Sequence, residues 1–243
     1  MESKINRYSK QLILINSFFI LAWLIVSVFP FIWTFWGSFK VKADFFSRAD
    51  WMFAVTGVNT LIETGDTSTV KAYVESWTEG EFWKATMNTI IITVSVVTIS
   101  LFLGTLGAYA LSRSTYKYTF WILIAALIFR AMPHITLVSG YLFPFFQLNV
   151  WGILPTTIIV LVAINQPFTL WLLYSFFKTV PKELDESALI DGCSYFQAFR
   201  FVIMPVMWPG VVTAGLFSMM LAYNDFTVTS LLLNQQNYTM VPK

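Results

Sequence analysis

The sequence has very few of the residues that cross-link a chain or hold a metal ion. Its 243 residues include one cysteine, Cys193, and one histidine, His134. A single cysteine excludes an internal disulfide, and one cysteine with one histidine does not supply a zinc site. No G-x-x-x-x-G-K-[ST] loop occurs in the sequence, so we expect no ATP held in the usual phosphate cradle and no cofactor. Any energy for work must come from a partner or from an ion gradient.

Charge is also scarce. Charged residues make up 12% of the chain and hydrophobic residues 57%, with a mean hydropathy of +0.67. Soluble domains carry roughly 25% charged residues, so these values predict a polytopic membrane protein. The net charge is only +2, and the absence of a basic run in the sequence gives no indication of nucleic-acid binding. The basic N-terminus precedes a long apolar run with no small-residue cleavage site, which predicts a retained anchor.

Five apolar runs have the roughly 20 residues that a membrane-spanning helix needs. They cover residues 11–36, 85–112, 118–142, 154–177 and 209–233. We therefore expect an all-α fold with a transmembrane domain over residues 11–233.

Lysine and arginine in short loops predict which side of the membrane each loop occupies. They place residues 1–10, the basic turn at 113–117 and the loop 178–208 in the cytoplasm. Segment 40–84 and residues 234–243 are then predicted to be exterior.

The predicted cytoplasmic loop 178–208 is polar and lies between two long uncharged runs. Pro181 suits the first turn of a helix, and the carboxylates that follow it favour the positive end of the helix dipole. Gly192 can end that helix in the left-handed conformation. Ser194 and Gln197 have the spacing of a capping box for a second helix, which we expect Pro205 to end. The loop is therefore predicted to form a helix–hinge–helix on the cytoplasmic face.

The same loop resembles the cytoplasmic EAA loop of binding-protein-dependent ABC importers. The pattern of that family is E-A-A, three residues, G, nine residues, then I-x-L-P. The chain keeps the family's residue at Glu186, Ala188, Gly192 and Pro205. It departs from the pattern at Ser187, Val202 and Met204. Two weaker matches point to the maltose-type sugar permeases. They are Arg130-Ala131-Met132-Pro133 and Tyr223-Asn224-Asp225.

The resemblance implies a permease subunit of a sugar importer in the prokaryotic cytoplasmic (inner) membrane. It implies four further proteins as partners: a second permease subunit, two copies of a cytoplasmic ATPase subunit and an exterior solute-binding protein. ATP hydrolysis would belong to the ATPase subunits, so the chain itself is expected not to be an enzyme. The resemblance assigns the ATPase interface to Glu186, Ser187, Ala188, Asp191, Gly192 and Pro205. The family normally has a sixth span, so we expect this sequence, which stops at Lys243, to be truncated.

Polar residues inside the predicted spans are candidates for a translocation path or gate. They are Arg130, Asn165, Gln166, Asn224 and Asp225. Arg130 lies about halfway along the third predicted span, where a charge is functional by default, and Asp225 is its nearest candidate partner. The alternative is that carbonyl groups freed by Pro133 satisfy this arginine. Asn165 and Gln166 interrupt the fourth span and line a polar cavity or, equally well, pack against a neighbouring helix.

Two other functions remain open from the residues alone. An ion-coupled secondary transporter would use Arg130, His134 and Asp225 as a relay, although such proteins often have internal repeats and none is visible. A non-transporting membrane scaffold would explain the hydrophobicity but would leave the spacing of the EAA loop to chance. Stimulation of a partner ATPase distinguishes the importer from both.

Overall fold

The computed structural model describes residues 2–38, 68–234 and 237–240, and the chain divides into two compact units at Gly80. The first unit contains α1 (Glu2–Gly37) and α4 (Ser68–Thr78). Side chains along the apolar part of α1 are almost all exposed. Most of the predicted exterior segment 40–84 lies outside the described residues.

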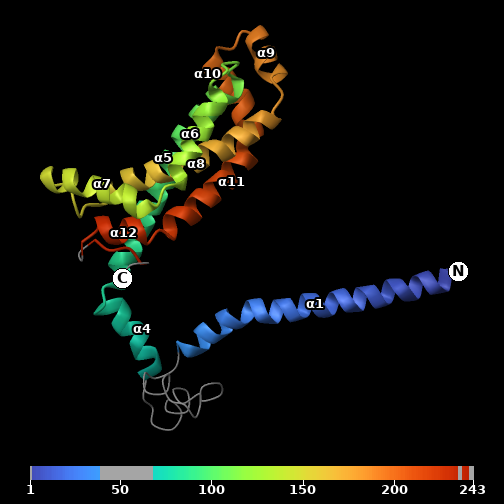
Figure 1. The fold of residues 1–243 in the computed structure, drawn as a ribbon, viewed down its shortest axis with the longest axis vertical. Helices are drawn as coiled ribbons and strands as arrows, with labels where there is room; N and C mark the ends of the chain where they lie inside the picture. Colours follow the sequence, from blue (N-terminus) through green and yellow to red (C-terminus); the bar gives the residue numbers. More distant parts are fainter. Residues whose placement is uncertain (1, 39–67, 235–236, 241–243) are drawn as a thin grey trace. The chain divides into compact units, whose positions relative to one another are not determined.

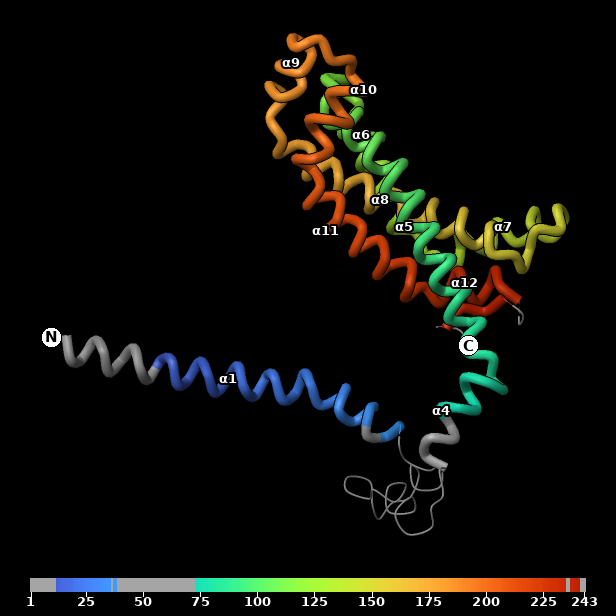
Figure 2. The backbone as a smooth tube through the Cα atoms, turned by 180° about the vertical axis from the view of Figure 1, so that it is seen from behind, coloured from blue at the N-terminus to red at the C-terminus, as the bar shows by residue number. Residues whose placement is uncertain are grey.

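Three long helices form the centre of the second unit. They are α5 (Phe82–Arg113), α8 (Leu154–Thr179) and α11 (Met204–Tyr223). Figure 1 shows α5 and α8 side by side with α11 against them, and Figure 2 shows the same group from behind. The buried positions of α5 recur every three or four residues from Ala85 to Ser112, so a single face of this helix packs against its neighbours.

Small residues let α5 and α8 approach closely. A Cβ atom at Gly104 would lie 3.1 Å from Cγ2 of Thr169, and one at Gly107 would lie 3.1 Å from Cδ1 of Leu170. Both distances are tighter than most van der Waals contacts of a Cβ atom. Packing of spanning helices depends on such small residues, because lipid offers no hydrophobic drive for helices to associate.

The third predicted span is broken. Instead of one helix over 118–142, the chain forms α6 (Thr119–Ala131) and α7 (His134–Gln147), bent by 85° at the break. Met132 is extended, with φ −68° and ψ 142°, and Pro133 follows it. Proline disfavours a helical conformation at the preceding residue and cannot donate to the helix ladder, which explains the break. In Figure 1, α7 turns aside at the end of the group opposite α9.

The fifth predicted span, 209–233, begins earlier and ends earlier than expected. Residues 195–223 form one helical run, made of α10 (Tyr195–Gln197), the π-helix η1 (Ala198–Ile203) and α11. The prediction that Pro205 ends a separate helix is wrong, because this proline lies in the first turn of α11. The N–H group of Met204 bonds to the carbonyl of Phe199, five residues back, so the helix is already wide where the proline enters.

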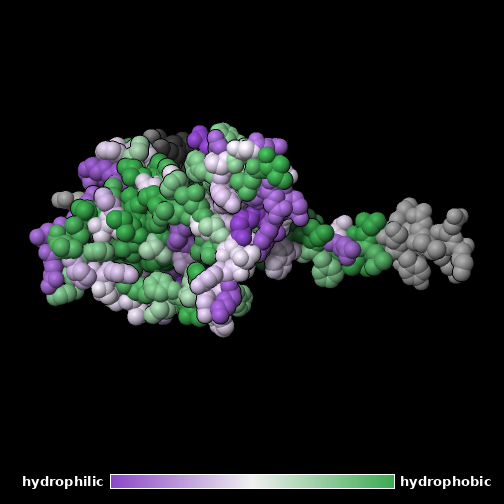
Figure 3. All heavy atoms as spheres, turned by 90° about the horizontal axis from the view of Figure 1, so that it is seen from above, coloured by the Kyte–Doolittle hydropathy of each residue, from purple (hydrophilic) through white to green (hydrophobic). Residues whose placement is uncertain are grey.

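Length and composition give four to five candidate spans, against the five predicted. Four described helices are long and apolar enough to cross a membrane, and the bent pair α6 and α7 would make a fifth. Large apolar side chains remain exposed on them, including Phe102 at 65%. Figure 3 shows hydrophobic residues over much of one face of the molecule. Such a surface fits a bilayer and not water.

Candidate functional site

The helix α9 (Glu183–Ile190) carries the central part of the predicted ATPase interface. One side of it is exposed and the other is buried. The exposed side, which we call the docking face, consists of Glu183, Glu186, Ser187 and Ile190. These positions are spaced i, i+3, i+4 and i+7, so they lie on one side of a helix, and Ile190 is 86% exposed. Ala188, also predicted to be in the interface, is instead buried at 4% exposure.

The turn after α9 has the conformation predicted for Gly192. Its φ is +87°, in the left-handed region, and a Cβ atom there would meet no atom within 4 Å. The glycine is therefore needed for its backbone and not for space. The predicted capping box is also confirmed: the N–H of Ser194 donates to Oε1 of Gln197 at 2.8 Å, and the N–H of Gln197 donates to Oγ of Ser194 at 3.3 Å. Asp191, just before the turn, is exposed.

The buried side of α9 is held by one carboxylate, that of Asp185. Nε of Arg113 lies 2.8 Å from Oδ2 of Asp185, and Oη of Tyr109 donates to Oδ1 at 2.5 Å. Nη1 of Arg113 also donates to the backbone carbonyls of Phe177 at 3.2 Å and Val180 at 3.0 Å. The last turn of α5 thus contacts α9 and the end of α8 at once.

The ring of Tyr109 adds apolar contacts to this network. Its centroid lies 5.7 Å from that of Phe177 in α8 and 4.8 Å from that of Phe199 in η1. Both phenylalanines are buried. The tyrosine therefore lies where α5, α8, α9 and η1 meet.

Sequence reasoning assigned Asp185 only to the dipole at a helix start and gave no site role to Arg113 or Tyr109. A signal was present: Arg113 is the first charge after the uncharged run that begins at Ala85. A cation at the end of a span needs water, lipid phosphate or a carboxylate partner. The loop that resembles the EAA loop contains such a carboxylate, Asp185, but its pairing with Arg113 depends on how three helices pack and cannot be predicted from spacing.

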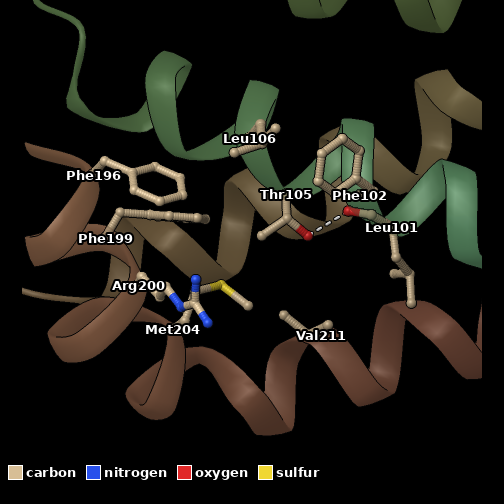
Figure 4. Close-up of a pocket in the computed structure, with 9 residues that line it drawn as sticks. All are labelled: Leu101, Phe102, Thr105, Leu106, Phe196, Phe199, Arg200, Met204 and Val211. Carbon is tan, nitrogen blue, oxygen red and sulfur yellow. Dashed lines mark hydrogen bonds between the residues drawn. The ribbon is translucent and has the colours of Figure 1, made fainter.

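An apolar hollow lies beside the loop, between α5 and the helical run 195–223 (Figure 4). Its volume is about 450 Å³, and it is lined by Leu101, Phe102, Thr105, Leu106, Phe196, Phe199, Arg200, Met204 and Val211. The hydroxyl of Thr105 donates to the carbonyl of Leu101 in its own helix, as Figure 4 shows. The guanidinium of Arg200 is therefore the single charged group in an otherwise apolar lining.

The residues predicted to line the path lie in two places: near the break between α6 and α7, and between α5 and α8. At the broken span, Nδ1 of His134 lies 3.8 Å from Oδ2 of Asp225. The guanidinium of Arg130 instead lies 5.1 Å from the ring centroid of Phe168, and its Nη1 is buried with no hydrogen-bond partner in the described part of the chain. The imidazole of His134, and not the expected guanidinium of Arg130, thus lies beside Asp225. Arg130 is in the last turn of α6, just before the break between α6 and α7.

Asn165 and Gln166 lie in the packed seam between α5 and α8. Asn165 is 4% exposed, and its Nδ2 has no partner among the residues that the structure describes. Nε2 of Gln166 is 3.5 Å from the backbone carbonyl of Ser100, a weak hydrogen bond. Asn224 is exposed, and its Nδ2 donates to the carbonyl of Met220 at 2.9 Å. This placement of Asn165 fits helix packing better than the lining of a wide cavity.

Comparisons with known proteins give one consistent picture. The family model described as "Binding-protein-dependent transport system inner membrane component" matches residues 10–242. A diacetylchitobiose uptake system permease protein of Streptomyces coelicolor is 28% identical over 229 residues, covering 90% of this chain and 68% of that protein. A trehalose/maltose transport system permease protein of Thermococcus litoralis is 31% identical over 236 residues, covering 96% and 79%.

A solved structure shares the fold. It is the crystal structure of a bacterial ABC transporter involved in the import of the acidic polysaccharide alginate. The TM-score is 0.69 at 19% identity, with 94% of this chain and 76% of that chain covered.

Proposed function

We propose a function from one premise: this chain belongs to the family of inner membrane components of binding-protein-dependent transport systems. We infer that it is a permease subunit of an ATP-driven importer and forms half of the path for a sugar or a similar polar solute. The names of its relatives, which transport diacetylchitobiose and trehalose or maltose, support a sugar. The partners in this proposal are a second permease subunit, two ATPase subunits and an exterior solute-binding protein.

The docking face of α9 carries this proposal. A loop that leaves the membrane would normally place polar groups outward, yet Ile190 is 86% exposed beside the carboxylate of Glu186. Tyr195, just after the turn, is also exposed, at 74%. An apolar side chain beside charged and aromatic groups is typical of a surface that a partner covers. We assign this surface to the ATPase subunit and therefore propose that loop 178–208 is cytoplasmic. If α6 and α7 count as one span, four spans separate this loop from the N-terminus, which we then also propose to be cytoplasmic.

The His134–Asp225 pair is the best-placed polar group for the translocation path. It lies at the end of the helix group opposite α9, where α7 and the short helix α12 (Thr227–Leu232) meet. In the proposed orientation that end is exterior. Ionisable groups in a spanning region are costly and usually serve a pathway, so we assign the pair, with Arg130 and Asn224 near the same break, to the path or its gate.

Co-purification with the cognate ATPase subunit tests the proposal. We expect Glu186→Lys and Ile190→Asp to lose the ATPase subunit from the purified complex. The matched control is Lys117→Glu, a charge reversal at an exposed residue in the other predicted cytoplasmic turn, which should retain it. Retention of the ATPase subunit by both docking-face variants would contradict the assignment.

Ion coupling stays a second candidate because the imidazole of His134, at the break in the third span, lies beside the carboxylate of Asp225, which follows α11. Uptake into vesicles separates the two functions. An importer of the proposed kind takes up solute only with ATP and binding protein, whether or not a proton gradient exists. Uptake that follows the gradient without ATP would favour the ion-coupled function.

A further inference from the structure

A charged side chain holds α9 from the side opposite the docking face. Asp185 is 8% exposed, while the neighbouring Glu186 is exposed. Its partner Arg113 is also largely buried, with side-chain exposures of 16% and 12% for the arginine and the aspartate. A buried ion pair is costly to desolvate and is not in itself evidence of stability. Stability alone therefore does not explain why Asp185 and Arg113 are paired here.

The ion pair adds a polar contact to the apolar contacts of α9. Leu184 of α9 packs, partly buried, against the cluster that includes Phe199, and the other buried residue of this helix, Ala188, has only a small side chain. The turn at Gly192 has open space around its Cα and a backbone that only glycine adopts readily, so it transmits force poorly. The carboxylate of Asp185, by contrast, accepts a hydrogen bond from Tyr109 and forms an ion pair with Arg113 at 2.8 Å, although this pair lacks hydrogen-bond geometry.

Arg113 and Tyr109 extend these contacts beyond α9. The guanidinium of Arg113 holds the carbonyls of Phe177 and Val180, and so fixes the end of α8. The planar guanidinium spreads five donors over three nitrogen atoms, so it can face a carboxylate and two carbonyls on different helices, whereas a lysine presents its three donors from one atom. α9 also packs on η1, which continues into α11 and whose Phe199 contacts the Tyr109 ring, so the link to α5 acts beside a second route through α11.

We propose that Asp185, Arg113 and Tyr109 form a link that carries a displacement of α9 into the spanning helix α5. The proposal rests on the docking of an ATPase subunit at α9, as inferred above. The three residues are positioning residues: they contact neither ATP nor solute, and they act by keeping α9, α8 and α5 moving as one body. Without the link, an ATPase subunit would still bind the docking face but would move α9 with less effect on the spans.

The test compares assembly with coupling in the same reconstituted complex of both permeases, the ATPase subunits and the binding protein. Asp185→Asn has nearly the same shape and keeps an oxygen for Tyr109, but it removes the charge. We expect the purified complex to retain the ATPase subunits while solute transported per ATP hydrolysed falls about tenfold, the size expected from losing a charge-assisted contact. Lys117→Gln, which removes an exposed charge elsewhere, is the matched control and should leave this ratio unchanged.

Tyr109→Phe is the second variant and deletes a single hydroxyl from the link. We expect it to lower the ratio up to about tenfold, as for one hydrogen bond to a charged acceptor. If the Asp185→Asn complex does not assemble, the ratio of solute transported to ATP hydrolysed in the Tyr109→Phe complex tests the link. A normal ratio in an assembled complex of either variant would overturn the link. Failure of the unmodified chain to bind an ATPase subunit would instead overturn the proposed function, so the two failures are distinguishable.

Discussion

The carboxylate of Asp225 makes two contacts with different elements. Its Oδ2 lies 3.8 Å from Nδ1 of His134, the first residue of α7, and its Oδ1 accepts the N–H of Val228 at 2.7 Å in the first turn of α12. One residue therefore joins the broken third span to the turn that follows α11. Charge and helix capping are separable functions of this side chain, and substitutions can tell them apart.

Asp225→Asn should keep the cap and lose the charge, whereas Asp225→Ala loses both. An amide oxygen caps a helix about as well as a carboxylate, so we expect Asn to leave the free energy of unfolding nearly unchanged and Ala to lower it by about 1 kcal/mol. If transport requires the charge, both variants lose transport. Thermal unfolding measures stability and uptake measures transport, both on the same preparations. Normal uptake with Asp225→Asn would show that transport does not require the charge.

Gly210 and Gly140 form a matched pair for testing helix packing. A Cβ atom at Gly210 would lie 2.9 Å from Cγ of Phe176, whereas one at Gly140 would meet nothing within 4 Å. We expect Gly210→Ala to destabilise the protein by about 1–3 kcal/mol through overpacking. Gly140→Ala should stabilise it slightly, by up to about 1 kcal/mol, because alanine favours a helix interior. Melting temperatures in detergent would show the difference, and equal effects would argue against this packing of α11 on α8.

Gly192→Ala tests the turn rather than a contact. The added methyl group meets no atom, so any effect comes from φ +87°, which costs a non-glycine residue about 1–2 kcal/mol. We expect weaker binding of the ATPase subunit, because α9 and α10 can no longer keep their angle. Gly192→Asn should be milder, since asparagine tolerates the left-handed region better. Equal binding by glycine, asparagine and alanine would show that the angle is unimportant.

Asn165→Leu decides between the two interpretations of the polar break in the fourth span. Nδ2 of Asn165 is buried without a partner in the described part of the chain, so replacing the amide by an apolar group of similar size should be neutral or stabilising. If Asn165 only packs, transport should survive. A stable variant that has lost transport would place this residue in the path.

Periodicity and composition predicted the helices where one physical rule dominates. Long uncharged runs gave α5 and α8 within a few residues, because a span needs length and apolarity and little else. The left-handed Gly192 and the capping box of Ser194 were predictable for a similar reason: both are local backbone chemistry.

Features that depend on contacts between helices were not predictable in this way. Pro133 breaks a helix, yet Pro205 lies in the first turn of one and Pro167 lies inside another. The sequence around each proline does not say whether neighbouring helices stabilise the continuation. The same holds for Asp185, whose partner is 72 positions away at Arg113, and for Asp225, whose partner is His134 rather than Arg130. Each pairing is set by tertiary packing.

The continuity of the helical run 195–223 has a mechanical consequence. Its 29 residues, at about 1.5 Å each, make a rod roughly 40 Å long that begins at the capping box next to α9 and ends at Tyr223. A tilt of about 5° about one end would carry the other end through about 4 Å, by the geometry of a rod of that length. Asn224 and Asp225 follow directly on the far end. A small rotation beside the docking face is thereby magnified into a shift comparable to the 3.8 Å between Asp225 and His134, enough to make or break that contact.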